Sequence, residues 1–313
     1  MQSITEYSFP RYLAAKKSVD DRALNRQVWD TLAAQLPTAS KQKPLRVLEI
    51  GAGIGTMIER MLEWNMLQRA HYTALDSLPE NAQAALPRLS KWAARHHMQI
   101  LPKAPYRWQL ADSHRRKKFE IEYRSEDLFA FIQRQSGQQQ WDLLVAHAFL
   151  DLVDIPATLP LLRPLLSPGG SFYFSLNFDG ATIFEPGIDP GFDRLVEALY
   201  HQSMDERVIA GRPAGDSQAG RHLFSLLRQA GYTITSAGAS DWVVFPINGS
   251  YPHDEAYFLH FIINTIHQEL KHHPKLDPER FEAWIAKRRQ QIEAAELVFI
   301  AHQLDFVGKL DRG

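Results

Sequence analysis

The most constraining feature of this chain is a glycine-rich turn between an apolar run and a helical segment. Residues 45–50 form an almost unbroken apolar run, which is typical of a strand buried on both faces of a sheet. Gly51, Gly53 and Gly55 follow at alternating positions, and the helical pattern of residues 56–67 begins at once. Such a turn lets a ligand approach the backbone N–H groups closely, and side chains at these positions would block that approach. The spacing predicts a ligand site on an α/β sheet.

Strand-like and helical segments alternate along most of the chain, a pattern typical of a parallel sheet with helices on both faces. We predict strands at residues 45–50, 71–76, 119–124, 141–147, 170–177, 232–245 and 297–310. We predict helices at residues 20–36, 56–67, 79–96, 126–135, 157–166, 192–201, 220–230, 254–272 and 278–296. The expected fold class is therefore α/β, with a doubly wound, mostly parallel seven-stranded sheet.

The composition narrows the functions that this turn can serve. The 313 residues include 35 Lys and Arg against 36 Asp and Glu, for a net charge of -1, which argues against a protein that coats nucleic acid. Cysteine is absent, which excludes disulfides, cysteine-ligated zinc and thiolate nucleophiles, including the covalent cytosine C5 mechanism. Without an H-E-x-x-H pair, we expect no metal. No apolar run approaches the roughly 18 residues of a membrane span, and the N-terminus does not read as a secretory signal, so the expected location is cytoplasmic.

The spacing of the glycines separates two classes of cofactor. A dinucleotide fingerprint, G-x-G-x-x-G, would need glycine where Thr56 stands, which argues against a nicotinamide oxidoreductase. The pattern here is G-x-G-x-G, preceded by the acidic residue Glu49. With these residues the sequence resembles the class I S-adenosylmethionine-dependent methyltransferases, over residues 45–245 and the last predicted strand. The resemblance implies a Rossmann-like methyltransferase fold with a helical cap, with S-adenosylmethionine as cofactor and S-adenosylhomocysteine as product.

The resemblance also implies which residues hold the cofactor. An acid at the end of the second strand is expected at the ribose hydroxyls. After the third strand, an acid and the next backbone N–H are expected at the adenine edge, and Glu49 is expected near the ammonium group of the methionine moiety. The full set is Glu49, Gly51, Ala52, Gly53, Gly55, Asp76, Ser77, Asp127, Leu128 and His147.

Other interpretations of the acidic residues stay open. Asp76 or Asp127, taken singly, could cap a following helix. Glu49 could be a structural partner for N–H groups of the glycine turn. The two aspartates nevertheless follow successive predicted strands, and open α/β sheets bind ligands at that edge. Their joint placement favours a cofactor site.

His147, at the end of the fourth predicted strand, is the candidate catalytic residue. A sulfonium is already an excellent leaving group, so in-line methyl transfer chiefly needs alignment of the nucleophile and exclusion of water. A base is needed only where the acceptor keeps its proton. His147 is a candidate for that base or for positioning the acceptor, and the alternative is a hydrogen-bonded histidine that supports the cofactor pocket.

The candidate acceptor-binding residues come from three segments outside the cofactor motifs. Family members often fold an N-terminal segment over the cofactor, one strand ends in an asparagine, and an aromatic stretch precedes a late helix. The candidates are Arg11, Tyr12, Asn177, Tyr251, His253 and Tyr257. The alternatives are surface docking of the N-terminal segment, a turn role for the asparagine, and a solvated helix face.

We expect residues 1–44 to form an N-terminal helical cap segment and residues 45–313 the methyltransferase domain. Insertions are expected at about residues 100–118 and 180–219, and a helical lid at about residues 250–292. The near-neutral charge and the aromatic cap favour a small-molecule acceptor, with neither nucleic acid nor membrane as partner. The sequence leaves open the acceptor atom, the oligomeric state, a nucleic-acid or protein acceptor, and a non-catalytic S-adenosylmethionine-binding role.

Overall fold

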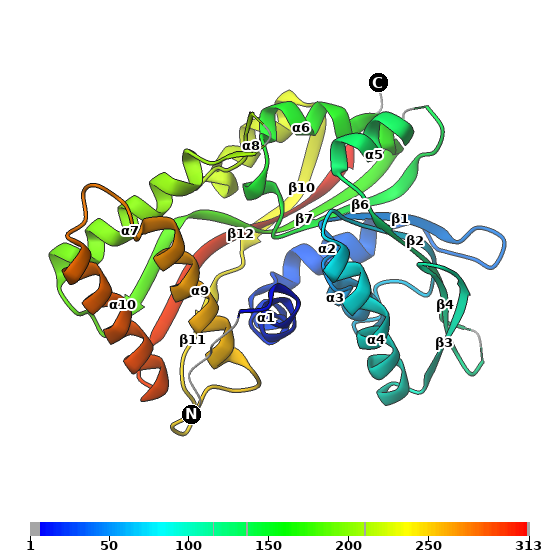
Figure 1. The fold of residues 1–313 in the computed structure, drawn as a ribbon. Helices are drawn as coiled ribbons and strands as arrows, with labels where there is room; N and C mark the ends of the chain where they lie inside the picture. Colours follow the sequence, from blue (N-terminus) through cyan, green and yellow to red (C-terminus); the bar gives the residue numbers. More distant parts are fainter. Residues whose placement is uncertain (1–6, 115, 136, 210, 312–313) are drawn as a thin grey trace.

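The computed structural model describes residues 7–114, 116–135, 137–209 and 211–311 (Figure 1). The strands are β1 Leu45–Ile50, β2 Arg69–Asp76, β3 Met98–Ala104, β4 Arg107–Asp112, β5 Lys118–Ser125, β6 Trp141–His147, β7 Leu166–Glu185, β8 Val208–Ile209, β9 Arg212–Pro213, β10 Tyr232–Ala239, β11 Trp242–Val244 and β12 Val298–Leu310. The helices are α1 Phe9–Ala23, α2 Arg26–Gln35, α3 Thr56–Glu63, α4 Pro79–Arg95, α5 Leu128–Gln135, α6 Ile155–Leu162, α7 Pro190–Asp205, α8 Ala219–Gln229, α9 Glu255–Leu270 and α10 Pro278–Glu293.

The predicted α/β fold is confirmed. The strands expected from the sequence are neighbours in one sheet, in the order β5–β2–β1–β6–β7–β12–β10. The first five in this order, β5, β2, β1, β6 and β7, run parallel to one another. Among the described residues the sheet has ten strands rather than seven. The hairpin β3–β4 extends the edge beside β5, and the single strand predicted over residues 232–245 divides into β10 and β11. Most side chains of β3 are exposed, so its sequence lacks the apolar alternation that marks a strand.

The helix predicted over residues 20–36 is wrong in its limits, because α1 ends at Ala23 and α2 begins at Arg26. Asn25 stands between them, and its side chain accepts a hydrogen bond from the Val28 N–H to cap α2. Its own N–H donates to Asp305 Oδ2 over 2.9 Å. An N-cap residue inside a regular apolar spacing therefore divides one predicted helix into two.

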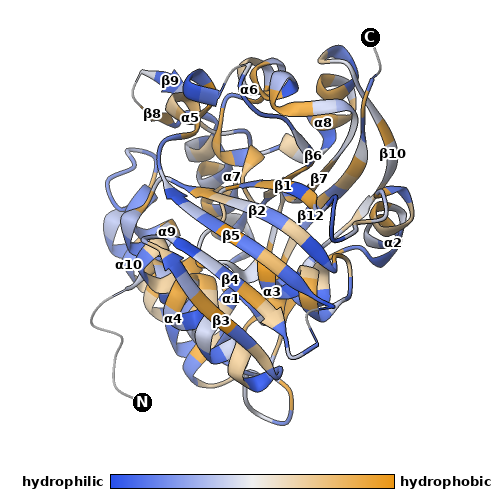
Figure 2. Cartoon of the chain, turned by 90° about the vertical axis from the view of Figure 1, so that its right-hand side faces the viewer, coloured by the Kyte–Doolittle hydropathy of each residue, from blue (hydrophilic) through white to orange (hydrophobic). Residues whose placement is uncertain are grey.

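Helices cover both faces of the sheet. Helices α2, α3 and α4 pack on one face and α5, α6 and α8 on the other, each group with its own apolar cluster. The central strands β1 and β6 are buried almost throughout, whereas β5 alternates between buried and less buried side chains. In Figure 2 the same strand alternates between hydrophobic and hydrophilic residues. The sheet is doubly wound, and its central strands are shielded on both sides.

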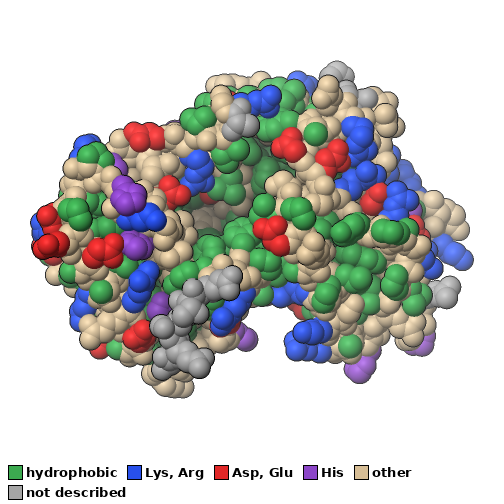
Figure 3. Space-filling view, in the orientation of Figure 1, with side chains coloured by type: hydrophobic (Ala, Val, Ile, Leu, Met, Phe, Trp, Pro, Cys, Tyr) green, Lys and Arg blue, Asp and Glu red, His purple; other side chains and the backbone are tan. Residues whose placement is uncertain are grey.

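A second group of helices is built on an extension of the sheet. The antiparallel pair β7–β12 runs from the Ser171–Lys309 pairing to the Glu185–Val298 pairing, and α7, α9 and α10 pack around its far end. Helix α1 joins this apolar cluster and also contacts α4. Figure 3 shows a hollow near the middle of the molecule, with hydrophobic side chains gathered in it.

The expected limits of the cap segment, insertions and lid stay predictions, and residues 1–6, 115 and 210 of those segments lie outside the described residues. None of the described helices combines the length and apolar content that crossing a bilayer requires.

Candidate active site

A cavity of about 810 Å³ opens at the carboxyl ends of β1, β2, β5 and β6. Parallel α/β sheets bind ligands at this edge, and the volume is in the range of small-molecule sites. Every residue predicted to hold the cofactor lines the cavity except Gly55, namely Glu49, Gly51, Ala52, Gly53, Asp76, Ser77, Asp127, Leu128 and His147. The fold thus gathers around one cavity residues that the sequence places after four different strands.

The glycine turn has the left-handed backbone that favours glycine, with φ of +68° at Gly51, +54° at Gly53 and +82° at Gly55. A Cβ on Gly51 would lie 2.5 Å from the Phe149 ring, and one on Gly53 would lie 2.9 Å from Leu13 Cδ1. These two glycines therefore leave room at the cavity wall. Gly55 has no such close contact and forms the N-cap of α3, so its role is conformational.

Asp76 ties the turn to the second strand. Its Oδ2 accepts a hydrogen bond from the Gly53 N–H (2.8 Å), and its Oδ1 accepts from the Leu78 N–H (2.9 Å) and from Asn81 Nδ2 (3.1 Å). The N-cap position of α4 belongs to Leu78, so Asp76 is not the helix cap that was one interpretation of it. Asn81 also lines the cavity, and its buried Oδ1 has no hydrogen-bond partner among the described residues. Such an acceptor suits a ligand donor.

Asp127 both caps a helix and lines the cavity. Its Oδ1 accepts hydrogen bonds from the N–H groups of Phe129 (2.9 Å) and Ala130 (3.0 Å), at the start of α5. The capping interpretation therefore holds for this residue, and its place in the cavity wall leaves the cofactor interpretation open.

Glu49 is buried in β1, and the described hydrogen bond to its carboxyl comes from the Tyr72 hydroxyl, 2.8 Å from Oε2. Burial raises its pKa to about 8, although Tyr72 and Arg60 oppose the shift. Glu49 is therefore largely protonated at neutral pH in the free protein. It does not hold the glycine turn, because the Gly53 N–H donates to Asp76 instead.

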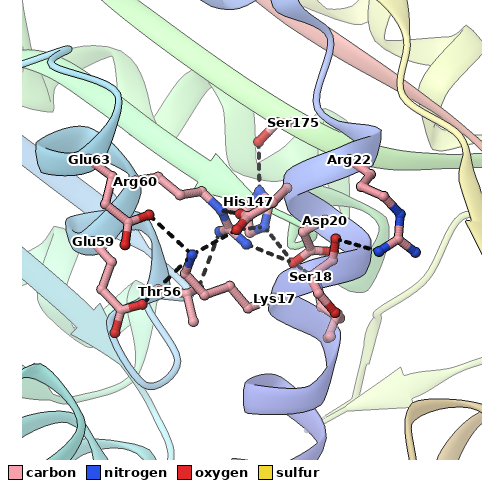
Figure 4. Close-up of polar contacts among 12 residues, drawn as sticks. Lys17, Ser18, Asp20, Arg22, Thr56, Glu59, Arg60, Glu63, His147 and Ser175 are labelled. Atoms are coloured by element: carbon pink, nitrogen blue, oxygen red, sulfur yellow. Dashed lines mark hydrogen bonds and ion pairs between the residues drawn. The ribbon is translucent and has the colours of Figure 1, made fainter. Parts of the chain in front are cut away.

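His147 lies in the cavity wall with both ring nitrogens engaged (Figure 4). Nε2 is 3.0 Å from Asp20 Oδ2 and 3.2 Å from Arg60 Nη1, and Nδ1 is 2.8 Å from Ser175 Oγ. A carboxylate only accepts, so the shorter contact to Asp20 favours a proton on Nε2, and the Arg60 guanidinium, which only donates, is then not hydrogen-bonded to that atom. Burial and the Arg60 charge lower the pKa of His147 to about 4, so the ring is neutral at pH 7. Its role as a base stays a prediction.

Helix α1 supplies cavity residues that the sequence did not reveal. Phe9, Leu13, Lys16 and Asp20 line the cavity at helical spacing, and both polar members are buried. Lys16 Nζ is 2.8 Å from Asp20 Oδ2, and the Trp242 indole N–H donates to Asp20 Oδ1 over 2.9 Å. Burial alone would raise the pKa of Asp20, but Lys16, His147 and Arg60 hold it well below its usual range.

The residues Arg11, Tyr12 and Tyr257, predicted to bind the acceptor, lie where α1 packs against α9. Arg11 pairs with Asp254 (2.9 Å) and lies 3.9 Å from the Tyr257 ring centroid, while Tyr12 stacks on Phe261 at 4.1 Å. The Tyr257 hydroxyl accepts a hydrogen bond from the Ser8 N–H over 2.7 Å. These residues fasten α1 to α9 and are not among the described residues that line the cavity.

The other acceptor candidates also lie away from the cavity wall. The Asn177 amide donates to the Leu304 carbonyl oxygen (2.8 Å), and the Tyr251 hydroxyl donates to the Leu297 carbonyl oxygen (2.8 Å). His253 occupies a left-handed turn ahead of α9, with φ of +53°. The hydrogen bonds of Asn177 and Tyr251 are internal to the fold and give no sign of a bound acceptor. The substrate role of all these candidates therefore stays a prediction.

The cavity wall carries more acidic than basic groups. Its carboxyl groups are those of Asp20, Glu49, Asp76, Glu126, Asp127 and Asp154, whereas its only lysine or arginine side chains among the described residues are Lys16 and Arg212. This balance favours a cationic ligand over a dinucleotide with its anionic pyrophosphate. No group of three or more potential metal ligands occurs among the described residues.

Comparison with known proteins gives one family. The sequence profile of a family described as "Methyltransferase domain" matches residues 21–237. None of the curated proteins compared matches the chain.

Several solved structures are similar to this chain at low identity. A putative type II methyltransferase from Anaeromyxobacter dehalogenans is 13% identical, with a TM-score of 0.49, covering 92% of this chain and 97% of that chain. A putative methyltransferase from Bacillus halodurans is 12% identical, with a TM-score of 0.48, covering 90% and 97%. A phosphoethanolamine N-methyltransferase from Haemonchus contortus, in complex with phosphomonomethylethanolamine and S-adenosylhomocysteine, is 11% identical, with a TM-score of 0.47, covering 97% and 58%.

Proposed function

The chain belongs to this methyltransferase-domain family and is an S-adenosylmethionine-dependent methyltransferase, and we propose that its acceptor is a small molecule. The observation that carries the proposal is the cavity itself. The cavity has a volume of about 810 Å³ and is lined on one side by α1. Acidic side chains outnumber basic ones in its wall. A nucleic-acid acceptor would need a basic approach to the site, and the chain as a whole has a net charge of -1.

The cofactor fits the groups that the wall offers. Glu49 suits an ammonium group, because a nearby cation would favour the ionised form of its buried carboxyl. Asp76 and the free Asn81 Oδ1 offer acceptors to the ribose hydroxyls. The Asp127 carboxylate suits the amino group of adenine, and the N–H of Leu128 suits a ring nitrogen that accepts a hydrogen bond. Gly51 and Gly53 leave room for the methionine part of the cofactor. We propose these roles for these residues.

The bound cofactor supplies a methyl group on a sulfonium, which needs no further activation. The task of this chain is to orient an acceptor and exclude water. Helix α1 forms one wall for that purpose, with Phe9 and Leu13 as its apolar part. Neutral His147 suits a positioning role better than proton removal, because Asp20 and Ser175 already engage its two ring nitrogens and neither nitrogen is free to meet the proton of an acceptor.

Calorimetric titration with S-adenosylhomocysteine, followed by a screen for transfer of labelled methyl to small metabolites, tests the proposal. We expect saturable binding and labelling of a small acceptor. Labelling of nucleic acid, with an affinity that falls steeply as salt rises, would instead favour the nucleic-acid alternative. Labelling of a protein would favour a protein acceptor, and binding without transfer to any acceptor would favour a non-catalytic module.

A further inference from the structure

The cofactor has one charged group for which the proposed site has no partner. The methionine end of S-adenosylmethionine carries a carboxylate as well as an ammonium. Glu49, Asp76 and Asp127 are all acids and match ammonium or hydroxyl donors. The carboxylate needs a cation or several N–H groups, because burying an unpaired anion is costly.

The cavity offers a choice of two full cations among its described residues. Arg212 is exposed on β9, and its guanidinium lies 4.8 Å from the Phe129 ring, next to the helix that Asp127 caps. It therefore stands at the end proposed for adenine. Lys16 follows Leu13 by one turn of α1, and Leu13 lies against Gly53. Lys16 therefore lines the cavity on the face of α1 whose Leu13 meets the glycine turn, and the methionine end is proposed to bind at that turn.

Lys16 also has hydrogen-bonding capacity to spare. It is only 5% exposed, and its described hydrogen bond goes to Asp20 Oδ2, whereas an ammonium has three donors. The same Oδ2 lies 3.3 Å from Arg60 Nη2 and 3.0 Å from His147 Nε2, so the Asp20 charge is shared. Arg60 is fully buried and does not line the cavity, so of the two cations around Asp20 it is Lys16 that faces the cavity.

We infer that Lys16 binds the carboxylate of the methionine moiety, so that α1 is held over the site by the cofactor itself. This inference rests on the proposed cofactor site. Burial lowers the pKa of Lys16 and Asp20 opposes the shift, so an anionic ligand would favour the charged form further. A buried ion pair contributes little stability by itself. Binding of the ligand carboxylate would explain why the Lys16–Asp20 pair lies in the cavity wall.

The test compares two ligands that differ only in the carboxylate, S-adenosylmethionine and decarboxylated S-adenosylmethionine, by calorimetry on the full chain. In Lys16→Met we expect the affinity for S-adenosylmethionine to fall about 10- to 100-fold, as for loss of a charged hydrogen bond. The affinity for the decarboxylated ligand should change by less than about twofold. Lys16→Arg should recover most of the loss, since it keeps the charge.

Lys17→Met is the matched control. Lys17 is the next residue of α1, pairs with Asp21 (2.7 Å) and Glu63 (3.4 Å), and does not line the cavity. It should bind both ligands as the wild type does, and thermal unfolding checks that both Met variants fold. If Lys16→Met weakens both ligands equally, or neither, the inference is overturned while the proposed function stands. Wild-type protein that binds neither ligand overturns the proposed function as well.

Discussion

Asp20, on the N-terminal helix α1, places its Oδ2 3.0 Å from Nε2 of His147, the last residue of β6. The contact joins residues 127 positions apart in the sequence. Arg60 from α3 contacts both side chains, so one buried network fastens α1, α3 and β6 together at the cavity (Figure 4). At its centre the buried carboxylate of Asp20 pairs with the cations of Lys16 and Arg60.

Replacing Asp20 by Asn should destabilise the fold strongly. The change removes the buried anion that Lys16 and Arg60 share and leaves their charges less compensated. Breaking a buried pair in this way costs about 3–5 kcal/mol, which urea unfolding would measure. Asp30→Asn, on an exposed position of α2, is the control and should change the unfolding free energy by less than about 0.5 kcal/mol. Equal, small losses in the two variants would contradict the account.

Gly53→Ala should weaken binding of S-adenosylhomocysteine at least about tenfold, or ~1.4 kcal/mol. Its Cβ would press on Leu13 and on the cavity wall, and Gly53→Val should abolish binding. Gly137→Ala is matched in backbone strain, with φ of +74° against +54°, but has nothing within 4 Å. Both Ala variants should lose about 1 kcal/mol of stability to the left-handed backbone, and calorimetry should show normal affinity only in Gly137→Ala. Normal affinity in both would mean that the ligand lies elsewhere.

Glu49 should make the free protein less stable as the pH rises. Its pKa is about 8 in the folded protein against an ordinary 4.5, so the folded state keeps a proton that the unfolded state loses between those values. The unfolding free energy therefore falls across this window, at up to about 1.4 kcal/mol per pH unit from this group. Urea unfolding at pH 5, 6, 7 and 8 should show a flatter profile for Glu49→Gln than for the wild type. Parallel profiles would show that Glu49 is ionised in the free fold.

The same carboxyl should couple ligand binding to proton release. An ammonium near Glu49 favours the ionised form, so binding of S-adenosylhomocysteine at pH 7 should release up to about one proton. Calorimetry in buffers with different ionisation enthalpies counts that proton. We expect the release in the wild type and little or none in Glu49→Gln; the same count in both would place the ammonium elsewhere.

His147 should make the protein less stable as the pH falls, the opposite of the effect expected from Glu49. Its pKa of about 4 lies below the ordinary 6.5, so between these values the unfolded state binds a proton that the folded state does not. Stability from this group is present above about pH 6.5 and is lost as the pH falls toward 4. His147→Gln should therefore lose less unfolding free energy than the wild type between pH 6.5 and 4. Equal losses in His147→Gln and in the wild type over this range would contradict the assignment.

The sequence predicted those parts of the fold and site that local signals determine. The glycine turn, the apolar runs of β1 and β6 and the acids after β2 and β5 are all defined by neighbours in the chain. The edge strand β3 escaped because its side chains are mostly exposed, and the break at Asn25 because one capping residue interrupts a regular apolar spacing.

The polar side of α1 could not be predicted in the same way. Lys16 and Asp20 matter through contacts with His147, Arg60 and Trp242, which come from distant segments. The one local signal was the spacing of Phe9, Leu13, Lys16 and Asp20 along a helix, and the predicted helix began only at residue 20. Arg11 and Tyr12 were chosen instead, and their side chains pack on α9.

A crystal structure of the chain with S-adenosylhomocysteine tests the central claim most directly. We predict the adenosine between Asp76 and Asp127, and the amino-acid end beside Gly51, Gly53 and Glu49. Nucleoside density at any other place, or an occupied cavity with no contact to either aspartate, would contradict it.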